Sequence, residues 1–542
     1  MRGLALGLAL LWPATAAAID PPKFVDEAAK AGIDHRYTGG WEFFVGGGVA
    51  AFDCDGDLDT DLAFAGGSSP TALFRNVGET AGPLRFEPVA GLEIDAVSGI
   101  YALDLTSDGI QDLVLLRVGE NLILEGLGDC RFERANERLG FAGGESWSTA
   151  FAAVFEAGQT LPTLFVGNYV DRHQPGAPFG TCHDHDLFRP EGGHYAAPTP
   201  LRPGFCALSA LFSDWDRDGT PDLRISNDRQ YYRGGIEQLF RLAPGQPPFE
   251  YGPAQGFRPV KIWGMGIASH DLTGDGLPEV FLTSMADNQL QTLADTRRGI
   301  DLRPAYDDIA LARGVTLHRP YLEDAVRPST AWHAEFDDLN NDGLIDLFVA
   351  KGNVEGMQEF AARDPNNLAL GQGDGTFAEA APEAGLVTFQ RARGAALTDL
   401  NLDGLLDLVV VNREAPAELW RNLGRARSDG GFAPMGQWLQ LRLHQAGANP
   451  DAIGAWIEVR SGAHIWRREV TAGGGHASSD AGWLHFGLGT AERAEIRVQW
   501  PDGEWGPWLR AFTSGFLGIE RGRDQPRIWL PPAAPGRIAE AR

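Results

Sequence analysis

A nine-residue pattern rich in oxygen-bearing side chains recurs six times along the chain. Its first, third, fifth and ninth positions are Asp, Asn, Thr or Glu, and a Gly usually stands at the sixth. Oxygen ligands at this spacing around a sharp turn can converge on one Ca²⁺, a cation that binds hard oxygens. The sequence therefore predicts about six calcium ions as cofactors. The predicted ligands are Asp53, Asp55, Asp57 and Asp61; Asp104, Thr106, Asp108 and Asp112; Asp214, Asp216, Asp218 and Asp222; Asp271, Thr273, Asp275 and Glu279; Asp338, Asn340, Asp342 and Asp346; and Asp399, Asn401, Asp403 and Asp407.

Loops of this composition also allow two other interpretations, an EF-hand loop and a plain acidic turn. A helix-flanked EF-hand loop needs a bidentate Glu at position 12. In four copies that position is apolar, being Phe64, Ile225, Val349 and Val410. Each loop also lies between two apolar stretches rich in β-branched residues, which places it on a strand–loop–strand hairpin. The alternative that remains is a set of acidic turns that bind no cation.

The spacing of the copies indicates a β-propeller. The gap between the copies that start at Asp104 and Asp214 is about twice the usual length and holds a degenerate copy at 155–165, where the hydrophobic frame persists. With it, seven copies start 51 to 67 residues apart. The ligand positions of the degenerate copy carry no carboxylate, so we expect that blade to bind no calcium; they are Phe155, Ala157, Gln159 and Thr163.

The composition fits a repeat of short strands and excludes some partners. The 542 residues include 69 Gly and 34 Pro without a low-complexity tract, which is typical of many short elements joined by tight turns. A formal charge of −27 would be repelled by a phosphate backbone, so nucleic acid is excluded as a partner. Beyond the N-terminus no stretch has the roughly 18 apolar residues of a membrane span, so we expect no transmembrane segment.

The N-terminus has the pattern of a secretory signal peptide over residues 1–18. Arg2 precedes an apolar run from Leu4 to Trp12, and Ala16 and Ala18 occupy the small-residue positions of a cleavage site. We expect cleavage after Ala18 and a secreted or periplasmic chain that begins at Ile19. A buried helix is the alternative.

The four cysteines can pair if the chain is exported. Cys182 and Cys206 flank an irregular insertion with little core of its own, and we favour a disulfide between them. Cys54 and Cys130 then pair by elimination, or they remain two free buried thiols.

Other residues could carry chemistry outside the loops. No standard catalytic motif is present, and we predict no catalytic or cofactor-binding residue. His183 and His185 would share one face of an extended segment and could bind Zn²⁺ or Cu²⁺ with His194, or they are solvated loop residues. We expect His476 and His485 to be structural or surface groups. Four aromatic residues precede propeller loops and could line the channel for sugar stacking or pack in the core: Trp41, Trp147, Trp263 and Trp332.

The loops resemble the FG-GAP/VCBS calcium repeats of integrin-type propellers. The phrases at 71–78, 373–386 and 418–424 are similar to outer-strand segments of the secreted cartilage acidic protein family and its bacterial relatives. The resemblance implies an all-β fold, in which a seven-bladed integrin-like FG-GAP β-propeller over residues 19–424 is followed by a small C-terminal β domain.

The C-terminal region resembles the ASPIC/UnbV module of the same family. The phrases that carry this resemblance lie at 451–459, 468–476, 484–489 and 498–504. We expect a linker at 425–436, an ASPIC/UnbV-like β domain at 437–520 and a tail at 521–542. Where the family has a Gly-Tyr-x-Ser-Gln-like segment, this chain has residues 475–479, Gly-His-Ala-Ser-Ser, so any ligand role of that segment does not carry over.

A second internal match indicates how the ring closes. Residues 23–33 parallel residues 376–386, with Phe and Gly eight positions apart in both. The N-terminal copy has no blade before it, and the last blade breaks off after 418–424 without such a segment. We therefore expect residues 23–33 to pair beside the strand at 418–421, which would cover both unpaired edges.

Two classes of function stay open. The main prediction is an exported calcium-binding β-propeller that acts as a binding or scaffold protein for a protein or glycan ligand. The alternative is a secreted enzyme, polysaccharide lyase-like or modifying an exported small molecule, with its site on the propeller face or in the inter-domain cleft. A pocket with converging titratable groups would favour the enzyme.

Overall fold

The computed structural model describes residues 21–174, 181–228, 234–297, 302–322 and 325–532. The expected signal peptide and the new N-terminus at Ile19 lie outside these residues. The helices of the described ranges are single turns, each ended by a left-handed Gly. None of them is long and apolar enough to cross a membrane. They are α1 (Ala28–Ala31), α2 (Asn136–Leu139), α3 (Ala310–Arg313) and α4 (Ala381–Ala384), and one 3₁₀ turn, η1, covers Trp41–Phe43.

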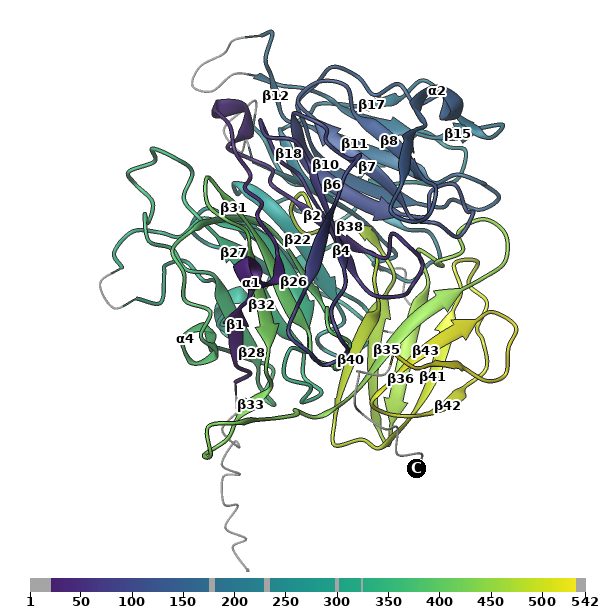
Figure 1. The fold of residues 1–542 in the computed structure, drawn as a ribbon. Coiled ribbons are helices and arrows are strands. Elements are labelled where there is room, and N and C mark those ends of the chain that lie inside the picture. The colour runs from purple at the N-terminus through teal and green to yellow at the C-terminus, as the bar shows by residue number, and fades with distance from the viewer. Residues whose placement is uncertain (1–20, 175–180, 229–233, 298–301, 323–324, 533–542) are drawn as a thin grey trace, which may run out of the picture.

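Seven antiparallel sheets form the blades of a propeller, numbered here in chain order (Figure 1). Blade 1 is β2 (Val49–Phe52), β3 (Asp61–Phe64), β4 (Ala72–Asn76) and β5 (Phe86–Val89); blade 2 is β6 (Val97–Leu103), β7 (Asp112–Arg117), β8 (Leu122–Gly126) and β9 (Phe132–Arg134); blade 3 is β10 (Ser148–Val154), β11 (Thr163–Asn168), β14 (His185–Phe188) and β17 (Thr199–Leu201); blade 4 is β18 (Ala207–Ser213), β19 (Asp222–Asn227), β20 (Gln238–Arg241) and β21 (Phe249–Glu250). Blade 5 is β22 (Gly264–His270), β23 (Glu279–Ser284), β24 (Gln289–Leu293) and β25 (Tyr306–Asp308); blade 6 is β26 (Ala331–Asp337), β27 (Asp346–Lys351), β28 (Asn367–Gly371) and β29 (Phe377–Glu379); blade 7 is β30 (Arg391–Thr398), β31 (Asp407–Arg413), β32 (Glu418–Asn422) and β1 (Phe24–Asp26). The predicted all-β, seven-bladed propeller is confirmed.

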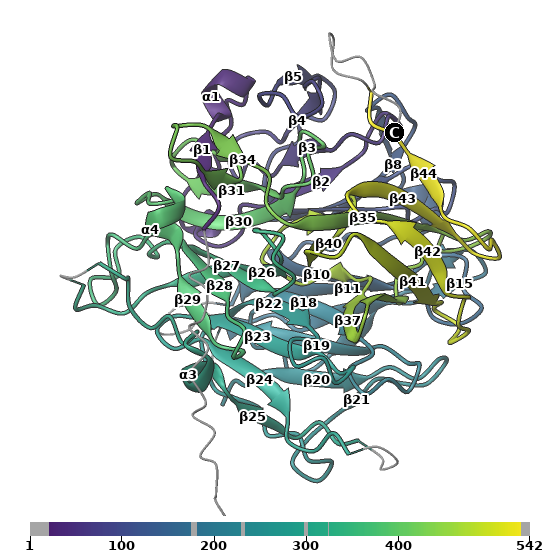
Figure 2. The same ribbon diagram turned by 90° about the horizontal axis from the view of Figure 1, so that it is seen from below.

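The first strand of each blade lies toward the centre of the ring (Figure 2). Each first strand contacts the first strand of the next blade, and β30 contacts β2. The apolar core is divided into clusters between neighbouring blades; Phe64 and Val409 share one cluster, and Phe165 and Phe212 share another. The apolar runs that flank each loop in the sequence are these strands, which are buried on both faces.

The N-terminal segment closes the ring as predicted. β1 pairs antiparallel with β32, and Phe24 lies opposite Asn422. Backbone hydrogen bonds extend the pairing at both ends, from Lys23 N to Gly424 O at 2.9 Å and from Glu27 N to Leu419 O at 2.8 Å. Blade 7 is therefore assembled from the two ends of the propeller sequence.

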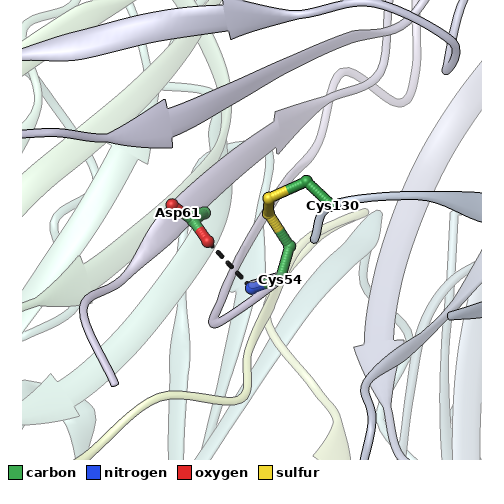
Figure 3. Close-up of side chains that lie close together, drawn as sticks. All are labelled: Cys54, Asp61 and Cys130. Carbon is green, nitrogen blue, oxygen red and sulfur yellow. Dashed lines mark hydrogen bonds between the residues drawn. A yellow bond between two sulfur atoms is a disulfide. The ribbon is translucent and has the colours of Figure 1, made fainter. Parts of the chain in front are cut away.

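Both predicted disulfides are present. Cys182 pairs with Cys206, and Cys54 pairs with Cys130. The second bond joins the end of β2 to the hairpin between β8 and β9, so it ties blade 1 to blade 2. Cys54 also donates its backbone N–H to Asp61 at 2.8 Å (Figure 3).

The C-terminal module contains two four-stranded sheets that enclose an apolar cluster. One sheet has the order β40 (Leu484–Gly489), β35 (Gln437–His444), β43 (Gly515–Glu520) and β44 (Arg527–Trp529); the other has β37 (His464–Glu469), β36 (Trp456–Ser461), β41 (Arg493–Gln499) and β42 (Leu509–Phe512). β44 lies in the segment expected as a tail after residue 520. The expected linker contains a small hairpin of β33 (Arg425–Ala426) and β34 (Phe432–Ala433). Two further hairpins, β12 (Val170–Asp171) with β13 (Thr181–Cys182) and β15 (Pro190–Glu191) with β16 (His194–Tyr195), decorate blade 3.

Candidate functional site

The six predicted loops occupy equivalent places in six blades. In each, position 1 directly follows the first strand and position 9 is the first residue of the second strand. We name the loops by their blades: loop 1 starts at Asp53, loop 2 at Asp104, and loops 4 to 7 start at Asp214, Asp271, Asp338 and Asp399. Carboxylate oxygens converge in loop 1, from Asp53, Asp55 and Asp61, and in loop 4, from Asp214, Asp216 and Asp218, where each set lies within 4.8 Å.

All six loops share one backbone conformation. Positions 4 and 6 have positive φ in every loop, from 55° at Asn341 to 95° at Gly276. Position 6 is Gly in five loops, and the exception is Leu58. Left-handed backbone is costly for a branched side chain such as Leu58 or Leu402, so the surrounding structure imposes the turn at these positions.

Backbone N–H groups hold the carboxylates at positions 1, 5 and 9. In every loop the N–H of position 6 donates to position 1, and the N–H of position 7 donates to position 5. Position 9 accepts from the N–H of position 2 in four loops, such as Leu339 N to Asp346 at 2.9 Å. Loop 2 uses Thr106 N instead, and loop 4 uses the indole N–H of Trp215. These contacts orient the side chains and leave other lone pairs free.

In three of the six loops protein contacts do not satisfy position 3. The buried atoms Asp55 Oδ1, Thr106 Oγ1 and Asn401 Oδ1 have no hydrogen-bond partner. Asp271 Oδ1 at position 1 of loop 5 is in the same condition. An unpaired buried oxygen costs about 1–3 kcal/mol, so these four loops contain acceptors that need a cation or donor.

The carboxylates repel one another and are costly to ionise without a counter-ion. Burial is the largest effect, and it raises the pKa of Asp61 to about 8 and those of Asp112, Asp222 and Glu279 to about 7. In loops 6 and 7, burial raises the pKa of the position-1 and position-9 carboxyls well above the usual range. A divalent cation in each loop would offset both the desolvation and the repulsion.

The observed oxygens fit calcium. They are hard, several per loop, and partly unsatisfied, and Ca²⁺ accepts flexible oxygen coordination. The residues that would hold the ion are those at positions 1, 3, 5 and 9. The bound ion would supply positive charge that neutralises the loop and links the ends of two strands.

The degenerate copy at 155–165, loop 3, pairs with a cation from outside the loop, Arg189. Glu156, at position 2, accepts from Arg189 Nε at 2.7 Å and from Thr163 Oγ1 at 2.6 Å. The Glu156 side chain is 6% exposed, so the guanidinium neutralises a buried carboxylate. The sequence pattern missed this residue because position 2 is not a ligand position in the other loops.

The C-terminal module docks on the face of the propeller that carries the loops. Arg442 contacts Asp53 of loop 1 at 3.4 Å, and Arg467 contacts Asp271 of loop 5 at 3.2 Å. Gln440 donates to Asp399 Oδ2 of loop 7 at 2.7 Å. Three position-1 carboxylates therefore each contact a side chain of the module.

A segment of the module, residues 472–480, fills the centre of the ring, and we call it the plug. Its two ends join blades: β38 (Ala472–Gly473) pairs with β10, and β39 (Ser479–Asp480) pairs with β2. Between them it bonds to first strands of other blades, as in Gly474 N to Ala210 O and Ile100 N to Ala477 O. A Cβ on Gly48 would lie 1.7 Å from Ala477 O, so the plug requires Gly there.

His476 lies at the middle of the plug and is completely buried. Its Nε2 accepts from Gly46 N at 3.2 Å, and its Nδ1 donates to Leu208 O at 3.2 Å, which identifies the neutral tautomer. Its backbone N–H donates to His333 Nδ1 at 3.0 Å. Burial lowers the pKa of His476 to about 3. The segment that departs from the family pattern is thus a structural contact between the module and the inner strands.

A cavity of about 440 Å³ lies between loops 1 and 2 and the module. Its lining includes Tyr101, Arg442, Arg468 and Asp480. Burial raises the pKa of Asp480 to about 7. This is the inter-domain cleft considered for the alternative function.

The structure does not bring the three candidate zinc ligands together. His183 contacts Asp171 at 3.2 Å, whereas His185 is buried and accepts from Asn168 N at 3.2 Å. His194 is the exposed first residue of β16, and its Nδ1 is 3.4 Å from Gly192 O.

The four tryptophans divide between core and surface. Trp147 and Trp332 are 1% and 0% exposed, so they pack in the core; Trp41 is 43% exposed, and Trp263 is half-buried. The plug occupies the channel that these residues were considered to line. His485 is buried and, through Nε2, contacts Asn341 Oδ1 at 2.7 Å, so it is a structural group.

The seven sheets, the repeated loops and the docked module define a β-propeller with FG-GAP-type repeats and an ASPIC/UnbV-like module. Residues 338–410 match the FG-GAP-like repeat model, and residues 445–506 match the ASPIC and UnbV model. Cartilage acidic protein 1 of Mus musculus is 29% identical over 170 residues, which cover 31% of this chain and 25% of that protein. Cartilage acidic protein 1 of Xenopus tropicalis is 32% identical over 117 residues, which cover 21% of this chain and 17% of that protein. The resemblance to this family is confirmed over a match that spans a quarter or less of the relatives' length.

Solved structures with similar folds are more distant. The BBS1N chain crystallised with ARL6DN has a TM-score of 0.39 at 10% identity, covering 72% of this chain and 94% of its own. Trypanosoma rangeli sialidase has a TM-score of 0.36 at 9% identity, and the match covers 69% of this chain and 59% of the sialidase chain.

Proposed function

We propose that this chain is a calcium-binding β-propeller that acts as an exported binding or scaffold protein. The observation that carries the proposal is one loop conformation built six times, in which N–H groups fix positions 1, 5 and 9 while buried oxygens at position 3 lack partners in three loops. Side chains that only formed turns would not need such acceptors. The repetition favours cation loops over plain acidic turns.

Calcium would act here on structure. Each ion would stabilise the junction of a first and a second strand, and the module contacts position 1 of loops 1, 5 and 7. Because ions bound to the folded state stabilise it by mass action, calcium would stabilise the blades and the docking of the module together.

Export is supported by two disulfides, by the signal-peptide pattern and by the resemblance to cartilage acidic protein. We propose a protein or glycan as the ligand. A rigid ring with a filled centre offers its outer surfaces for such contacts, which suits a scaffold.

The inter-domain cavity supports a second candidate, a secreted enzyme. Asp480 has a pKa raised to about 7 and lies with Arg468 and Tyr101 in that cavity, which suits a general acid or base. If the protein is an enzyme, it should turn over a member of a substrate panel, and Asp480→Asn should abolish that turnover without lowering the number of calcium ions bound. If the protein is only a scaffold, the parent protein should turn over no substrate of the panel.

Metal analysis and calorimetry of the exported protein test the calcium proposal. We expect about six ions per chain at millimolar calcium and a melting temperature that falls with EDTA and rises again with calcium. Asp214→Ala with Asp218→Ala should remove one ion, whereas the matched change Gln159→Ala in loop 3 should remove none. Fewer than about three ions, or a melting temperature independent of calcium, would refute the proposal.

A further inference from the structure

The two sheets of the module end side by side in unpaired strands. β42 is the last strand of one sheet and β44 is the last strand of the other, and no described strand lies beyond either. In Figure 2 both strands lie on the same side of the module, β44 near the C-terminus and β42 below it. Free edges present unpaired N–H and C=O groups that can accept another strand.

The inner face of the first sheet is uncovered at this edge. Leu517 on β43 lies opposite Ile528 on β44, so the two side chains point to the same face. Leu517 belongs to the apolar core and is 4% exposed, whereas Ile528 is 69% exposed. Leu530, two residues further on, is 78% exposed. The core of the sandwich therefore extends past the last strand that covers it.

A groove of about 850 Å³ follows this edge. Phe516, Ile528, Trp529 and Leu530 line it from one sheet, and Phe512 lines it from β42. Three of the exposed large hydrophobic side chains of the described residues gather in this one groove: Phe512, Ile528 and Leu530.

The rim of the groove is cationic in a strongly acidic chain. Arg460, Arg493 and Arg510 line it together with one acid, Glu495. The Arg510 side chain is 89% exposed and lies 3.6 Å from Glu495, to which Arg460 is also paired at 2.8 Å. The formal net charge of the whole chain is −27, so a rim with three arginines and one acid differs in sign from the chain as a whole.

We propose that this groove binds an extended segment of a partner protein in which apolar and acidic residues alternate. The segment adds as a strand to the edge of β42. Side chains of an added strand alternate between its two faces. One set would cover Ile528 and the inner face, and the other set would lie beside Phe512 and Arg510 on the outer face. This inference rests on the proposed binding role and names the chemistry of one partner.

Fluorescence anisotropy with labelled octapeptides tests the proposal on the full-length protein in calcium. The probes are an alternating Val-Glu peptide, an alternating Val-Lys peptide, and the Val-Glu peptide with a central proline, which cannot complete the backbone pairing. We expect the Val-Glu peptide to bind at least about tenfold more tightly than the other two. The double variant Arg493→Glu with Arg510→Glu should reverse the preference between Glu and Lys.

Variants of the apolar contact complete the experiment. Ile528→Ser should weaken binding of the Val-Glu peptide by about tenfold or more, whereas Leu311→Ser, at an exposed site on α3, should not change it. If Ile528→Ser does not fold, the charge reversal still decides, because it changes surface residues only. The proposal is overturned if neither charged peptide binds, if both bind equally, or if binding appears only after residues 533–542 are deleted. A dimer of this chain that Ile528→Ser abolishes would also overturn it.

The failure of this inference can be told apart from the failure of the proposed function. Calcium stoichiometry and the calcium dependence of melting involve the ligand positions of the six loops, and none of those ligand residues lines the groove; the one loop residue there is Leu402, at position 4 of loop 7. A protein that binds calcium but not the peptide would retain the calcium proposal and lose this one.

Discussion

Replacing His476 by Ala tests whether the plug holds the ring together. The imidazole is completely buried and bonds to Gly46 N and Leu208 O, groups from two different parts of the propeller. Its removal would leave one buried donor and one buried acceptor without partners, at about 1–3 kcal/mol each. The space left beside Trp332, whose ring centroid is 5.1 Å from that of His476, adds a cavity cost. We expect the free energy of unfolding to fall by roughly 3–6 kcal/mol.

Urea unfolding monitored by tryptophan fluorescence in saturating calcium measures this loss. The matched control is His444→Ala, an exposed histidine of the same module, which should stay within about 0.5 kcal/mol of the parent protein. Hydrogen exchange adds a local readout, because the Gly46 amide should lose protection in the variant. A loss below about 1 kcal/mol, or unchanged protection at Gly46, would refute the role assigned to the plug.

Further measurements test the electrostatics and the cross-links. In EDTA, burial raises the pKa of four position-9 carboxyls to about 7–8 in the folded state, whereas the same groups have a pKa of about 4 in the unfolded chain. The folded state therefore binds more protons than the unfolded state between these values. The free energy of unfolding, measured by chemical denaturation, should fall as pH rises from 5 to 8. In saturating calcium the part of the slope that comes from these loop carboxyls should be lost, while buried acids outside the ligand positions, such as Asp480 with its pKa of about 7, should keep a smaller slope. The buried His185 and His476, with pKa values lowered to about 4 and 3, should add a loss of stability as pH drops below 6.5, and a slope that calcium does not change would contradict the assignment. Arg189→Met should destabilise by about 3–5 kcal/mol whether or not calcium is present, because it strands the buried Glu156, and a calcium-dependent loss would argue against a built-in cation. Replacing both Cys54 and Cys130 by Ser should cost about 2–5 kcal/mol, measured without reducing agent as a lower denaturation midpoint than that of the parent protein, and an unchanged midpoint would contradict a stabilising role for this disulfide.

The repeat made the propeller predictable from sequence. Carboxylates at fixed spacing located the turn between two strands, and the match of Phe24 to Phe377 located the strand that closes the ring. These features are local, because loop chemistry and strand alternation are encoded within about a dozen residues. The disulfides were predictable only in part. The Cys182–Cys206 pair followed from the insertion that these residues flank, whereas the Cys54–Cys130 pair followed only by elimination.

The docking of the module was not predictable in the same way. Nothing near His476 indicates that its partners are Gly46 and Leu208, which lie hundreds of residues earlier in the chain. Arg189 was missed as well, because it pairs with Glu156 across 33 sequence positions and neither residue fits the repeat. Contacts of this kind follow from the assembled ring and have no signature in a single sequence.

Closure of the ring by β1 sets an order of assembly for the newly made chain. Phe24 is synthesised before the blades, yet its partner Asn422 comes at the end of the propeller sequence, and the plug follows later still. The outer edge of β32 and the N-terminal strand β1 both remain unpaired until the blades between them have formed. Pairing across such a distance is slow and leaves adhesive edges exposed during the delay. In a chain truncated within blade 7, β1 would never find its partner strand. We would expect such a chain to accumulate as aggregates or to be degraded by cellular proteases.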